Sequence, residues 1–369
     1  MTEKNIHIAF MVGSLRMGGA ERMVIHSANE LSKHLHVSLL SLTGGEDLKR
    51  ELNSSVALHC FEKKKSLSAV PAVLKFLREK KPDVLVSTQI HVNLIAVLLK
   101  IFFRVKTKII LREATTPGSH FLEFDDFKSK LVKMAVRILY PRADAIVAIC
   151  EAVKDSLTTL RFARPEQIAV IYNPVVNPEF LERMKENAEH PFFKSGNPVI
   201  ISVGRLAPAK NFTLLIKAFN LLQKEIDARL LIIGEGQERK RLSSLISELG
   251  LNDKIILTGQ LVNPYPYLKK ATVYVLSSFY EGLPNALIEA MACGIQAVSV
   301  DCPGGSREIL LNGKLGRLVK VNDPEALAIG MKEAIEFPVE RKLLLDGSRR
   351  FESEKTAQGY LTLIKKLLK

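Results

Sequence analysis

Residues 273–309 decide the fold, and they read VYVLSSFYEGLPNALIEAMACGIQAVSVDCPGGSREI. An apolar run of strand length, 273–276, ends in a small polar turn. The stretch 285–293 then reads as a helix, with a proline just before it and Gly294 just after it. Proline at the start and glycine past the end are the usual boundaries of a helix. A second apolar strand follows at 297–300, so the stretch predicts strand, helix and strand of a parallel sheet.

Two glutamates lie at this junction. Glu281 is in the loop before the predicted helix, and Glu289 lies in the first turns of that helix. Both are therefore near a positive helix terminus, beyond the carboxyl end of a parallel strand, where open α/β sheets bind ligands. A lone glutamate in such a place is most often a solvated acid. The small residues Gly282 and Gly294, and a second glycine-rich turn at 303–305, favour a ligand crevice instead.

The rest of the chain repeats this alternation. A strand at 6–12 leads into a glycine-rich loop, 13–19, and a helix, 20–34, which is how a nucleotide-binding unit begins. The loop is neither G-x-G-x-x-G nor a Walker loop, and a plain tight turn explains it nearly as well. Further strands are predicted at 37–42, 84–87, 108–111, 145–149, 168–171, 199–203, 230–233 and 255–258, and further helices at 67–79, 92–103, 127–139, 151–160 and 212–223.

The length and the alternation predict two α/β domains, each a doubly wound parallel sheet covered on both faces. We assign residues 1–178 to an N-terminal domain and residues 198–350 to a C-terminal domain, with the polar segment 179–197 as the linker. Residues 351–369 are expected to form a C-terminal helix that packs back on the N-terminal domain. Two such domains leave a cleft between them as the natural ligand site.

Charge restricts the choice of partners. The net charge is +14, and residues 1–178 hold 26 basic and 17 acidic residues. A basic surplus favours phosphates, anionic lipid surfaces or nucleic acid. The chain has no tryptophan and no alternation of basic and aromatic residues, which argues against nucleic acid.

The remaining composition indicates a cytoplasmic protein. Four widely spaced cysteines suggest neither zinc nor disulfides. The N-terminal residues run straight into a strand without a secretory signal, and the apolar stretch 93–105, broken by Lys100, is too short to cross a bilayer. The Asp125-Asp126 pair is not an Asp-x-Asp motif, so no metal is expected.

A basic pair stands out in the second domain. Arg205 and Lys210 flank the loop that leaves the strand 199–203. A fork-shaped donor and a compact point charge are what a diphosphate needs, although two solvated basic residues are the simpler interpretation of this loop alone. Together with the two glutamates, which suit sugar and ribose hydroxyls, the pair predicts a nucleotide-sugar site.

These motifs carry a family resemblance. Gly204-Arg205-Leu206 with Lys210, the stretch FYEGLPNALIEAMACG and the following PGGSREI resemble retaining glycosyltransferases of family 4. Gly-Gly-Ala-Glu-Arg at 18–22 and Tyr-Asn-Pro-Val at 172–175 are also similar to that family. The resemblance covers essentially the whole chain, and it implies a GT-B fold, in which two Rossmann-like domains face each other across a cleft.

The resemblance also implies residue roles. Arg205 and Lys210 would neutralise the donor diphosphate as it leaves, Glu281 would lie against the transferred sugar, and Glu289 would bind the ribose. The leaving diphosphate would deprotonate the acceptor on the same face of the sugar, so that retention needs no carboxylate nucleophile.

Backbone groups would complete the donor site. The loop with Gly18 and Gly19 would offer an amide to the diphosphate, and the backbone around Gly282, Leu283 and Pro284 would finish the phosphate cradle.

The chain departs from the family pattern in two places. Many family members have a histidine just after the strand that corresponds to 108–111, but here residues 111–116 read LREATT. His120 is too far along to be its equivalent, which leaves Arg112 and Glu113 as candidates for the contact with the sugar. Gln296 also replaces the usual proline, which is expected to alter only the entrance to a strand.

The predicted function is transfer of a hexose or N-acetylhexosamine from a nucleotide-diphosphate sugar, with UDP favoured, to a lipid-linked or polysaccharide acceptor. Such a step belongs to cell-surface glycan synthesis, for example of lipopolysaccharide. The basic N-terminal domain would face an anionic membrane, giving a peripheral position on its inner face. A nucleotide-sugar epimerase of the same fold and a non-catalytic membrane-docking partner subunit are the alternatives. Neither a cofactor nor nucleic acid is expected.

Overall fold

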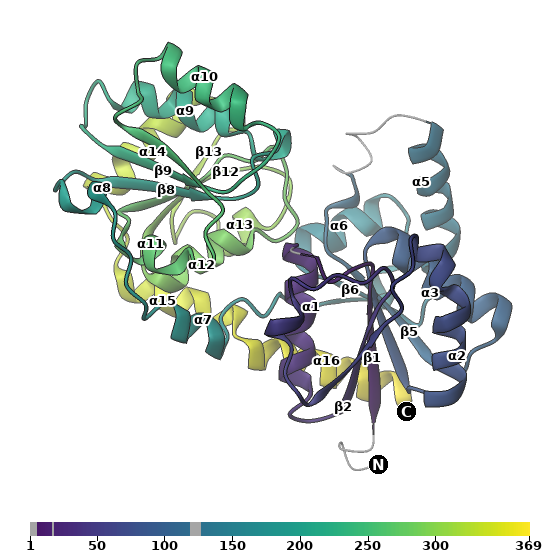
Figure 1. Cartoon of the computed structure of the whole chain (residues 1–369). Helices are drawn as coiled ribbons and strands as arrows, with labels where there is room; N and C mark the ends of the chain where they lie inside the picture. Colours follow the sequence, from purple (N-terminus) through teal and green to yellow (C-terminus); the bar gives the residue numbers. More distant parts are fainter. Residues whose placement is uncertain (1–5, 17, 119–126) are drawn as a thin grey trace. The chain divides into compact units, whose positions relative to one another are not determined.

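In a computed structural model the chain forms two α/β units (Figure 1). The structure describes residues 6–16, 18–118 and 127–369. Unit 1 comprises residues 1–174 and 352–369, and unit 2 comprises residues 175–351. Each unit is built around its own parallel sheet.

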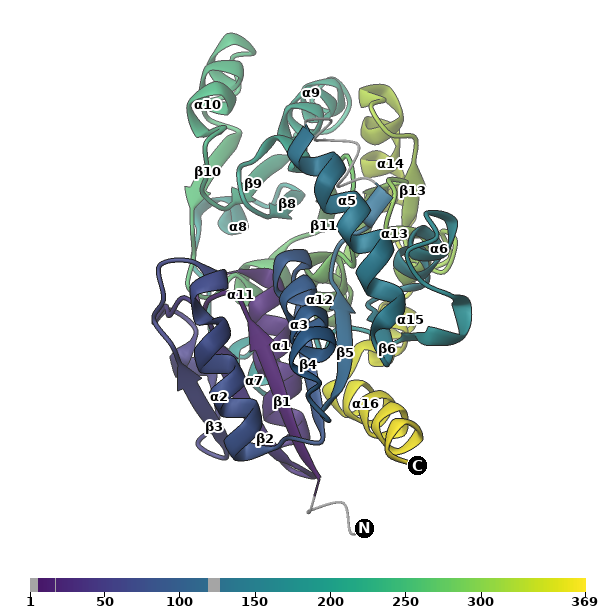
Figure 2. The same ribbon diagram turned by 90° about the vertical axis from the view of Figure 1, so that its right-hand side faces the viewer.

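Unit 1 contains a parallel sheet with the strand order β3-β2-β1-β4-β5-β6-β7. The strands are β1 (His7–Val12), β2 (His36–Ser41), β3 (Val56–Cys60), β4 (Val84–Thr88), β5 (Lys108–Glu113), β6 (Ala145–Ala148) and β7 (Ile168–Val170). The helices are α1 (Gly19–Leu31), α2 (Val70–Lys80), α3 (Ile90–Phe103), α5 (Phe127–Leu139), α6 (Glu151–Thr159) and α16 (Ser353–Leu368). Helices α1 and α16 cover one face of the sheet, and α2 and α3 cover the other (Figures 1 and 2).

The C-terminal helix α16 belongs to unit 1. The Tyr360 ring is buried in the core of this unit, where it meets Phe10 edge-on at a centroid distance of 6.0 Å. The Ser353 hydroxyl donates to Glu30 Oε2 on α1 at 2.7 Å. Residues far apart in the sequence therefore share one core, and the predicted return of the chain end is seen within this unit.

Unit 2 has the strand order β10-β9-β8-β11-β12-β13. The strands are β8 (Val199–Val203), β9 (Arg229–Ile233), β10 (Ile255–Gly259), β11 (Val273–Leu276), β12 (Gln296–Val300) and β13 (Arg317–Val319). Helices α9 (Phe212–Leu222), α10 (Arg239–Glu248) and α14 (Pro324–Glu336) lie on one side of the sheet. The other side carries α11 (Tyr265–Lys270), α12 (Asn285–Cys293) and α15 (Arg341–Ser348), and the short α13 (Ser306–Ile309) follows β12.

The domain boundaries differ from the predicted ones. The first unit ends at Pro174 rather than at residue 178. The segment predicted as a linker, 179–197, belongs to unit 2 and contains most of α7 (Pro178–Arg183) and all of α8 (Pro191–Lys194). The polar composition of this segment concealed Phe180, which is buried and packs edge-on against the ring of Tyr265. Among the described residues, no helix has both the length and the apolar character needed to cross a bilayer.

The strand orders indicate where a ligand site is expected in each unit. In an open parallel sheet the chain crosses in opposite directions on either side of a switch point, and a crevice opens there at the carboxyl ends of the strands. The switch lies between β1 and β4 in unit 1 and between β8 and β11 in unit 2. The loops that follow these four strands are therefore the places to look for chemistry.

Candidate functional site

The two loops at the switch point of unit 2 are bonded to each other. Residues 204–211 follow β8, and residues 277–284 follow β11. The Ser277 hydroxyl donates to the carbonyl oxygen of Lys210 at 2.9 Å, and the Phe279 amide donates to the carbonyl oxygen of Ala209 at 2.9 Å. The loop with the predicted cations is thus held against the loop with the predicted acid Glu281.

Neighbouring loops extend this frame on both sides. The Leu206 amide donates to the carbonyl oxygen of Glu235 in the loop after β9, at 2.9 Å. The Glu281 amide donates to Pro303 in the loop after β12, also at 2.9 Å, and the Gly305 amide donates back to Gly282 at 2.8 Å. Four consecutive loops at the carboxyl edge are joined by backbone hydrogen bonds, which gives the side chains a rigid base.

Two glycines make this close packing feasible. Gly234 has φ +152°, and a Cβ there would lie 1.8 Å from the carbonyl oxygen of Gly204. Gly304 has φ +134°, and a Cβ there would lie 2.5 Å from the carbonyl oxygen of Glu281. Any side chain at either position would force the loops apart. The glycine-rich turns seen in the sequence therefore allow neighbouring loops to touch.

The charged groups of the predicted site meet on this frame. Lys210 Nζ lies 2.6 Å from Glu281 Oε1, and the Ser278 hydroxyl donates to the same oxygen at 2.6 Å. The side chain of Lys210 is 30% exposed and that of Glu281 is 11% exposed. Arg205 is exposed, and no described residue forms an ion pair with it. A partly exposed ammonium and an exposed guanidinium are thus presented from one loop, as a diphosphate requires.

Glu289 lies on α12, the helix that follows this loop, and its side chain is half-buried. Tyr274 in β11 is fully buried, and its hydroxyl has no hydrogen-bond partner among the described residues. Burial raises the pKa of Tyr274 well above its usual value, and the charges of Glu281 and Glu289 raise it further. Both predicted acids therefore act on one buried hydroxyl in β11.

The predicted phosphate cradle leads into the N-terminus of α12. Leu283 is buried, and Pro284 occupies the N-cap position with φ −71° and ψ 93°. The first amides of a helix have no partner within the helix, and its N-terminus carries a partial positive charge. The backbone around Gly282, Leu283 and Pro284 is therefore placed where an anion would be stabilised, and its contact with a phosphate stays a prediction.

In unit 1 the two glycines predicted to meet the ligand differ in their surroundings. Gly18 is the N-cap of α1, and Gly19 is exposed as its first residue. A Cβ at Gly19 would meet no atom within 4 Å. Glu21 folds back beneath Gly18 and accepts a hydrogen bond from Gln89 Nε2 at 2.5 Å. Gly19 is therefore an exposed residue with free space on its Cα, and its contact with a diphosphate stays a prediction.

Arg112 lies at the end of β5, but its side chain is turned into unit 1. It is only 2% exposed, and its Nη2 donates to Asn173 Oδ1 at 2.5 Å. Burial lowers the pKa of Arg112, and the neighbouring Tyr360, Glu113 and Glu21 oppose that fall. The guanidinium therefore connects β5 to the segment before unit 2, and its predicted contact with a sugar stays a prediction.

Glu113 is buried in the same way. Tyr140 donates to Glu113 Oε2 at 2.9 Å, and Thr115 donates its hydroxyl to Oε1 at 3.0 Å. The network continues from Asn93, which donates to the Tyr140 oxygen at 3.1 Å and accepts from the Ser87 hydroxyl at 2.7 Å. Burial raises the pKa of Glu113, because a charged carboxylate is poorly solvated there. The carboxyl group orders the loop after β5, and a role in substrate binding remains a prediction.

Two positions were missed by the sequence reasoning. Ser278 was read only as part of a turn, although its hydroxyl orients Glu281. Gln89 has φ +81°, a conformation that is uncommon for residues other than glycine, and its side chain holds Glu21 at the edge of the glycine-rich loop. Neither residue belongs to a recognisable motif, and only the three-dimensional contacts identify it. Met17, His120 and the Asp125-Asp126 pair lie outside the described residues.

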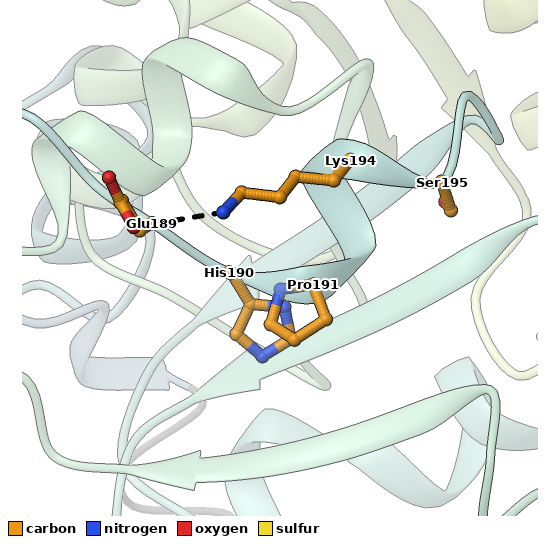
Figure 3. Close-up of a pocket in the computed structure, with 5 residues that line it drawn as sticks. All are labelled: Glu189, His190, Pro191, Lys194 and Ser195. Carbon is orange, nitrogen blue, oxygen red and sulfur yellow. Dashed lines mark ion pairs between the residues drawn. The ribbon is translucent and has the colours of Figure 1, made fainter.

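A surface hollow near α8 carries no comparable chemistry. It is lined by Glu189, His190, Pro191, Lys194 and Ser195 (Figure 3). Its one drawn ion pair joins Glu189 Oε2 and Lys194 Nζ at 3.8 Å, and both side chains are 75% exposed. Such a pair is solvated and contributes little. We therefore place the candidate site at the bonded loops of unit 2.

Comparison with solved structures defines the fold. A crystal structure of Anabaena HepE in complex with UDP and glucose superposes with a TM-score of 0.79 at 19% sequence identity, covering 98% of this chain and 100% of that chain. The two parallel-sheet domains and this likeness define a GT-B fold.

Sequence comparison identifies the family. The model of "Glycosyltransferase Family 4" matches residues 17–176, and that of "Glycosyl transferases group 1" matches residues 183–355. The N-acetylgalactosamine-N,N'-diacetylbacillosaminyl-diphospho-undecaprenol 4-alpha-N-acetylgalactosaminyltransferase of Campylobacter jejuni is 30% identical over 346 residues, which is 91% of this chain and 92% of that protein. A second Campylobacter jejuni relative, a GalNAc-alpha-(1->4)-GalNAc-alpha-(1->3)-diNAcBac-PP-undecaprenol alpha-1,4-N-acetyl-D-galactosaminyltransferase, is 26% identical and is covered over 98% of its length. The chain belongs to the group 1 glycosyltransferases and is a glycosyltransferase enzyme.

Proposed function

We propose that this enzyme transfers a hexose or N-acetylhexosamine from a UDP-sugar to a lipid-linked acceptor during cell-surface glycan synthesis, with retention of the anomeric configuration. The names of the Campylobacter jejuni relatives, which include diphospho-undecaprenol acceptors, support the acceptor class. The UDP in the structural neighbour supports the donor class. The observation that carries the proposal is the contact of Lys210 with Glu281 beside the exposed Arg205, at the switch point of unit 2.

The basic pair acts on the leaving group. When the bond between the sugar C1 and the diphosphate oxygen breaks, negative charge grows on the diphosphate. Lys210 and Arg205 stabilise this charge more in the transition state than in the bound donor, and that difference lowers the barrier. The frame of bonded loops fixes the backbone of both residues, and Glu281 also holds the Lys210 ammonium, so little reorganisation is needed as the charge develops.

Glu281 positions the sugar rather than attacking it. Lys210 Nζ and the Ser278 hydroxyl both bind Glu281 Oε1, which fixes the plane of the carboxylate. A fixed, ionised carboxylate is a strong acceptor for sugar hydroxyls. Glu289 on α12 is assigned to the ribose hydroxyls in the same way. A rigid hold on the sugar keeps C1 aligned with the incoming acceptor oxygen.

The diphosphate itself serves as the base. As the C1–O bond to the diphosphate breaks, the acceptor oxygen forms its bond to C1 on the same face. The acceptor proton passes to the departing diphosphate oxygen, so that atoms and charges balance. This route retains the configuration and needs no carboxylate nucleophile. We further propose that the reaction needs no divalent cation, since Arg205 and Lys210 supply the positive charge; turnover that disappears with EDTA and returns with magnesium would contradict this part.

A donor screen tests the function directly. The purified enzyme is incubated with UDP-sugars and an undecaprenyl-diphosphate-linked glycan dispersed in detergent, and UDP release is measured together with the mass of the product. Wild type should release UDP and add one sugar, whose anomeric proton in the NMR spectrum reports retention. Glu281→Gln should lower the rate by roughly a hundredfold while leaving thermal unfolding unchanged. An unchanged rate in this variant would sink the assignment of the site. Conversion of the donor without an acceptor would indicate an epimerase, and donor binding without turnover would indicate a non-catalytic subunit.

A further inference from the structure

Helix α5 carries an apolar stripe on its outer side. Its members are Phe127, Leu131, Met134 and Ile138, whose exposed fractions are 78%, 45%, 55% and 48%. At about 100° per residue, these four side chains fall within roughly 60° of one another around the helix axis. Exposed apolar residues scattered singly are normal on a protein surface, but four on one side of one helix mark an interaction site.

The stripe is not the face by which α5 packs into unit 1. Val136 is buried, and Val132, Ala135 and Leu139 are half-buried. Val132, Val136 and Leu139 lie on the side of the helix away from the stripe, Ala135 lies between the two sides, and α5 packs against α3 in the unit. Figures 1 and 2 show α5 at the rim of unit 1. The helix is therefore apolar on two sides, and the fold of unit 1 uses only one of them.

Basic side chains border the stripe. Helix α5 contains Lys128, Lys130, Lys133 and Arg137, all of them exposed, and no acidic residue. Lys130 and Arg137 lie on one flank of the stripe and Lys128 lies on the other, while Lys133 lies further round the helix beyond Lys130 and Arg137. Apolar residues on one face with cations beside them are the pattern of helices that lie in the interface of an anionic bilayer.

The adjacent helix α3, which contacts α5, ends in exposed residues of the same two kinds. It ends in Phe102 and Phe103, which are 73% and 45% exposed, followed by the exposed Arg104. Aromatic rings are favoured at the depth of lipid headgroups, and the arginine suits the anionic surface. The two packed helices thus present the same combination of apolar and basic groups.

We propose that the outer face of α5, together with the C-terminal end of α3, docks the enzyme on an anionic bilayer. This inference rests on the proposed function in one respect: a lipid-linked acceptor lies in that bilayer. Charge selects the occupant, because two copies of the basic helix meeting face to face would repel each other, whereas anionic headgroups attract it. The basic surplus of the chain predicts only an electrostatic attraction to the membrane. The stripe on α5 predicts in addition that apolar side chains insert into the bilayer.

Insertion and attraction respond differently to salt. Attraction between lysines and headgroups is screened as the ionic strength rises, but burial of apolar side chains is not. Binding to anionic vesicles should therefore weaken with salt and level off above zero. Complete release at high salt would show attraction without insertion and would overturn the proposal.

The test uses the full chain and sedimentation with vesicles of phosphatidylcholine, either pure or mixed with phosphatidylglycerol. Wild type should bind the mixed vesicles more tightly. The double variant Leu131→Gln/Met134→Gln should bind at least about tenfold more weakly to both kinds, because two apolar side chains no longer insert. Lys130→Glu/Lys133→Glu should lose at least about tenfold on the mixed vesicles and much less on the pure ones. The matched control is Val262→Gln/Phe337→Gln in unit 2, where the replaced side chains are 92% and 66% exposed, and its binding should equal that of wild type.

Three further readings complete the test. Thermal unfolding should be unchanged in every variant, and Phe127→Ser/Ile138→Gln repeats the apolar test if one pair disturbs the helix. Transfer to a detergent-dispersed acceptor should be normal in the α5 variants, while transfer to the same acceptor embedded in mixed vesicles should fall with binding.

If wild type binds vesicles but transfers no sugar, the proposed function fails and the docking surface stands. Vesicle binding that is the same in all variants overturns the docking surface. The proposal is also overturned if wild type is a dimer, the Leu131→Gln/Met134→Gln variant is a monomer, and that variant still binds vesicles as wild type does.

Discussion

The carboxyl edges of the two sheets differ in the exposure of their charged side chains. Both sheets have a switch point, and charged residues follow strands near each of them. In unit 2 the charges reach the surface: Arg205 is exposed, and Lys210 is 30% exposed. In unit 1 Arg112 and Glu113 are each only 2% exposed and are bonded to groups inside the unit. The cations of the loop after β8 are thus presented to solvent, whereas the two charges at the end of β5 are enclosed.

This difference indicates what each edge does. A partly exposed cation can still exchange water for a phosphate, so the edge of unit 2 is suited to bind a donor. A buried charge has already lost its water, and its partners keep the loops in one conformation. The edge of unit 1 offers backbone instead, at Gly19. The sequence shows which residues are charged but not which of them are buried. It therefore does not distinguish a ligand-binding charge from a structural one, because that distinction depends on burial.

The largest expected effect is at Lys210, the partly exposed cation of unit 2. Lys210→Ala should lower kcat/KM by roughly a thousandfold, because the growing charge on the diphosphate loses a preorganised partner. Steady-state UDP release measures the loss. The unfolding temperature should change little, since the ion pair with Glu281 is partly solvated.

The control for this variant is Lys217→Ala on α9, where an exposed lysine is removed from the same unit. It should leave kcat/KM at the wild-type value. Equal losses in the two variants would mean that general charge, rather than the position of Lys210, drives catalysis, and the contrast between the edges would lose its basis.

The second effect is on stability and belongs to unit 1. Arg112→Ala should lower the free energy of unfolding by about 3 kcal/mol, because it removes the buried hydrogen bond from Arg112 to Asn173 Oδ1 and the cation near Glu113. Urea denaturation measures this, with the exposed Arg78→Ala on α2 as a control that should cost less than about 0.5 kcal/mol. A large rise in the donor KM at unchanged stability would instead make Arg112 a substrate contact.

The sequence predicts much of this architecture, but it predicts little of the difference in burial between the charged residues of the two sheet edges. Helix bounds such as 285–293 and 127–139 agree with the structure because apolar periodicity and flanking proline or glycine encode them locally. The contact between Lys210 and Glu281 follows from the strand order, because β8 and β11 are neighbours in the sheet and the loops after them meet. The sequence motifs in these two loops suggest that neighbourhood. The enclosure of Glu113 depends on Tyr140 and Asn93, which are distant in the sequence and belong to no motif. The short strands β3 and β13 were missed because their burial is partial and their alternation is weak.

The third prediction concerns pH and the enclosed acid. Burial raises the pKa of Glu113 in the folded state, so the folded chain holds that proton more tightly than the unfolded chain does. The contribution of Glu113 to stability is therefore full below its unfolded pKa and is lost as the pH rises through the folded value. In Glu113→Gln this fall should disappear. The free energy of unfolding of wild type minus that of the variant, measured from acidic to neutral pH, should decrease as the pH rises.

The exposed Glu79→Gln on α2 serves as the control, and its difference from wild type should not depend on pH in this way. If the difference for Glu113→Gln rose with pH instead, the carboxylate would be stabilised in its charged form. The edge of unit 1 would then resemble the edge of unit 2 more closely than the burial of Glu113 indicates.

The smallest expected effects concern two glycines, Gly19, which has free space on its Cα, and Gly234, which packs against a neighbouring loop. Gly19→Ala should raise the free energy of unfolding by about 0.5 kcal/mol, because no atom lies within 4 Å of the added methyl group and the unfolded chain loses freedom. The same methyl group should raise the donor KM roughly tenfold, equivalent to about 1.4 kcal/mol, if a phosphate approaches the Gly19 amide. Gly234→Ala should do the reverse and destabilise unit 2 by about 2 kcal/mol, because its left-handed backbone and the contact with Gly204 exclude a side chain. A Gly19→Ala enzyme with an unchanged donor KM would show that the open loop of unit 1 does not contact the donor, and donor recognition would then rest on unit 2 alone.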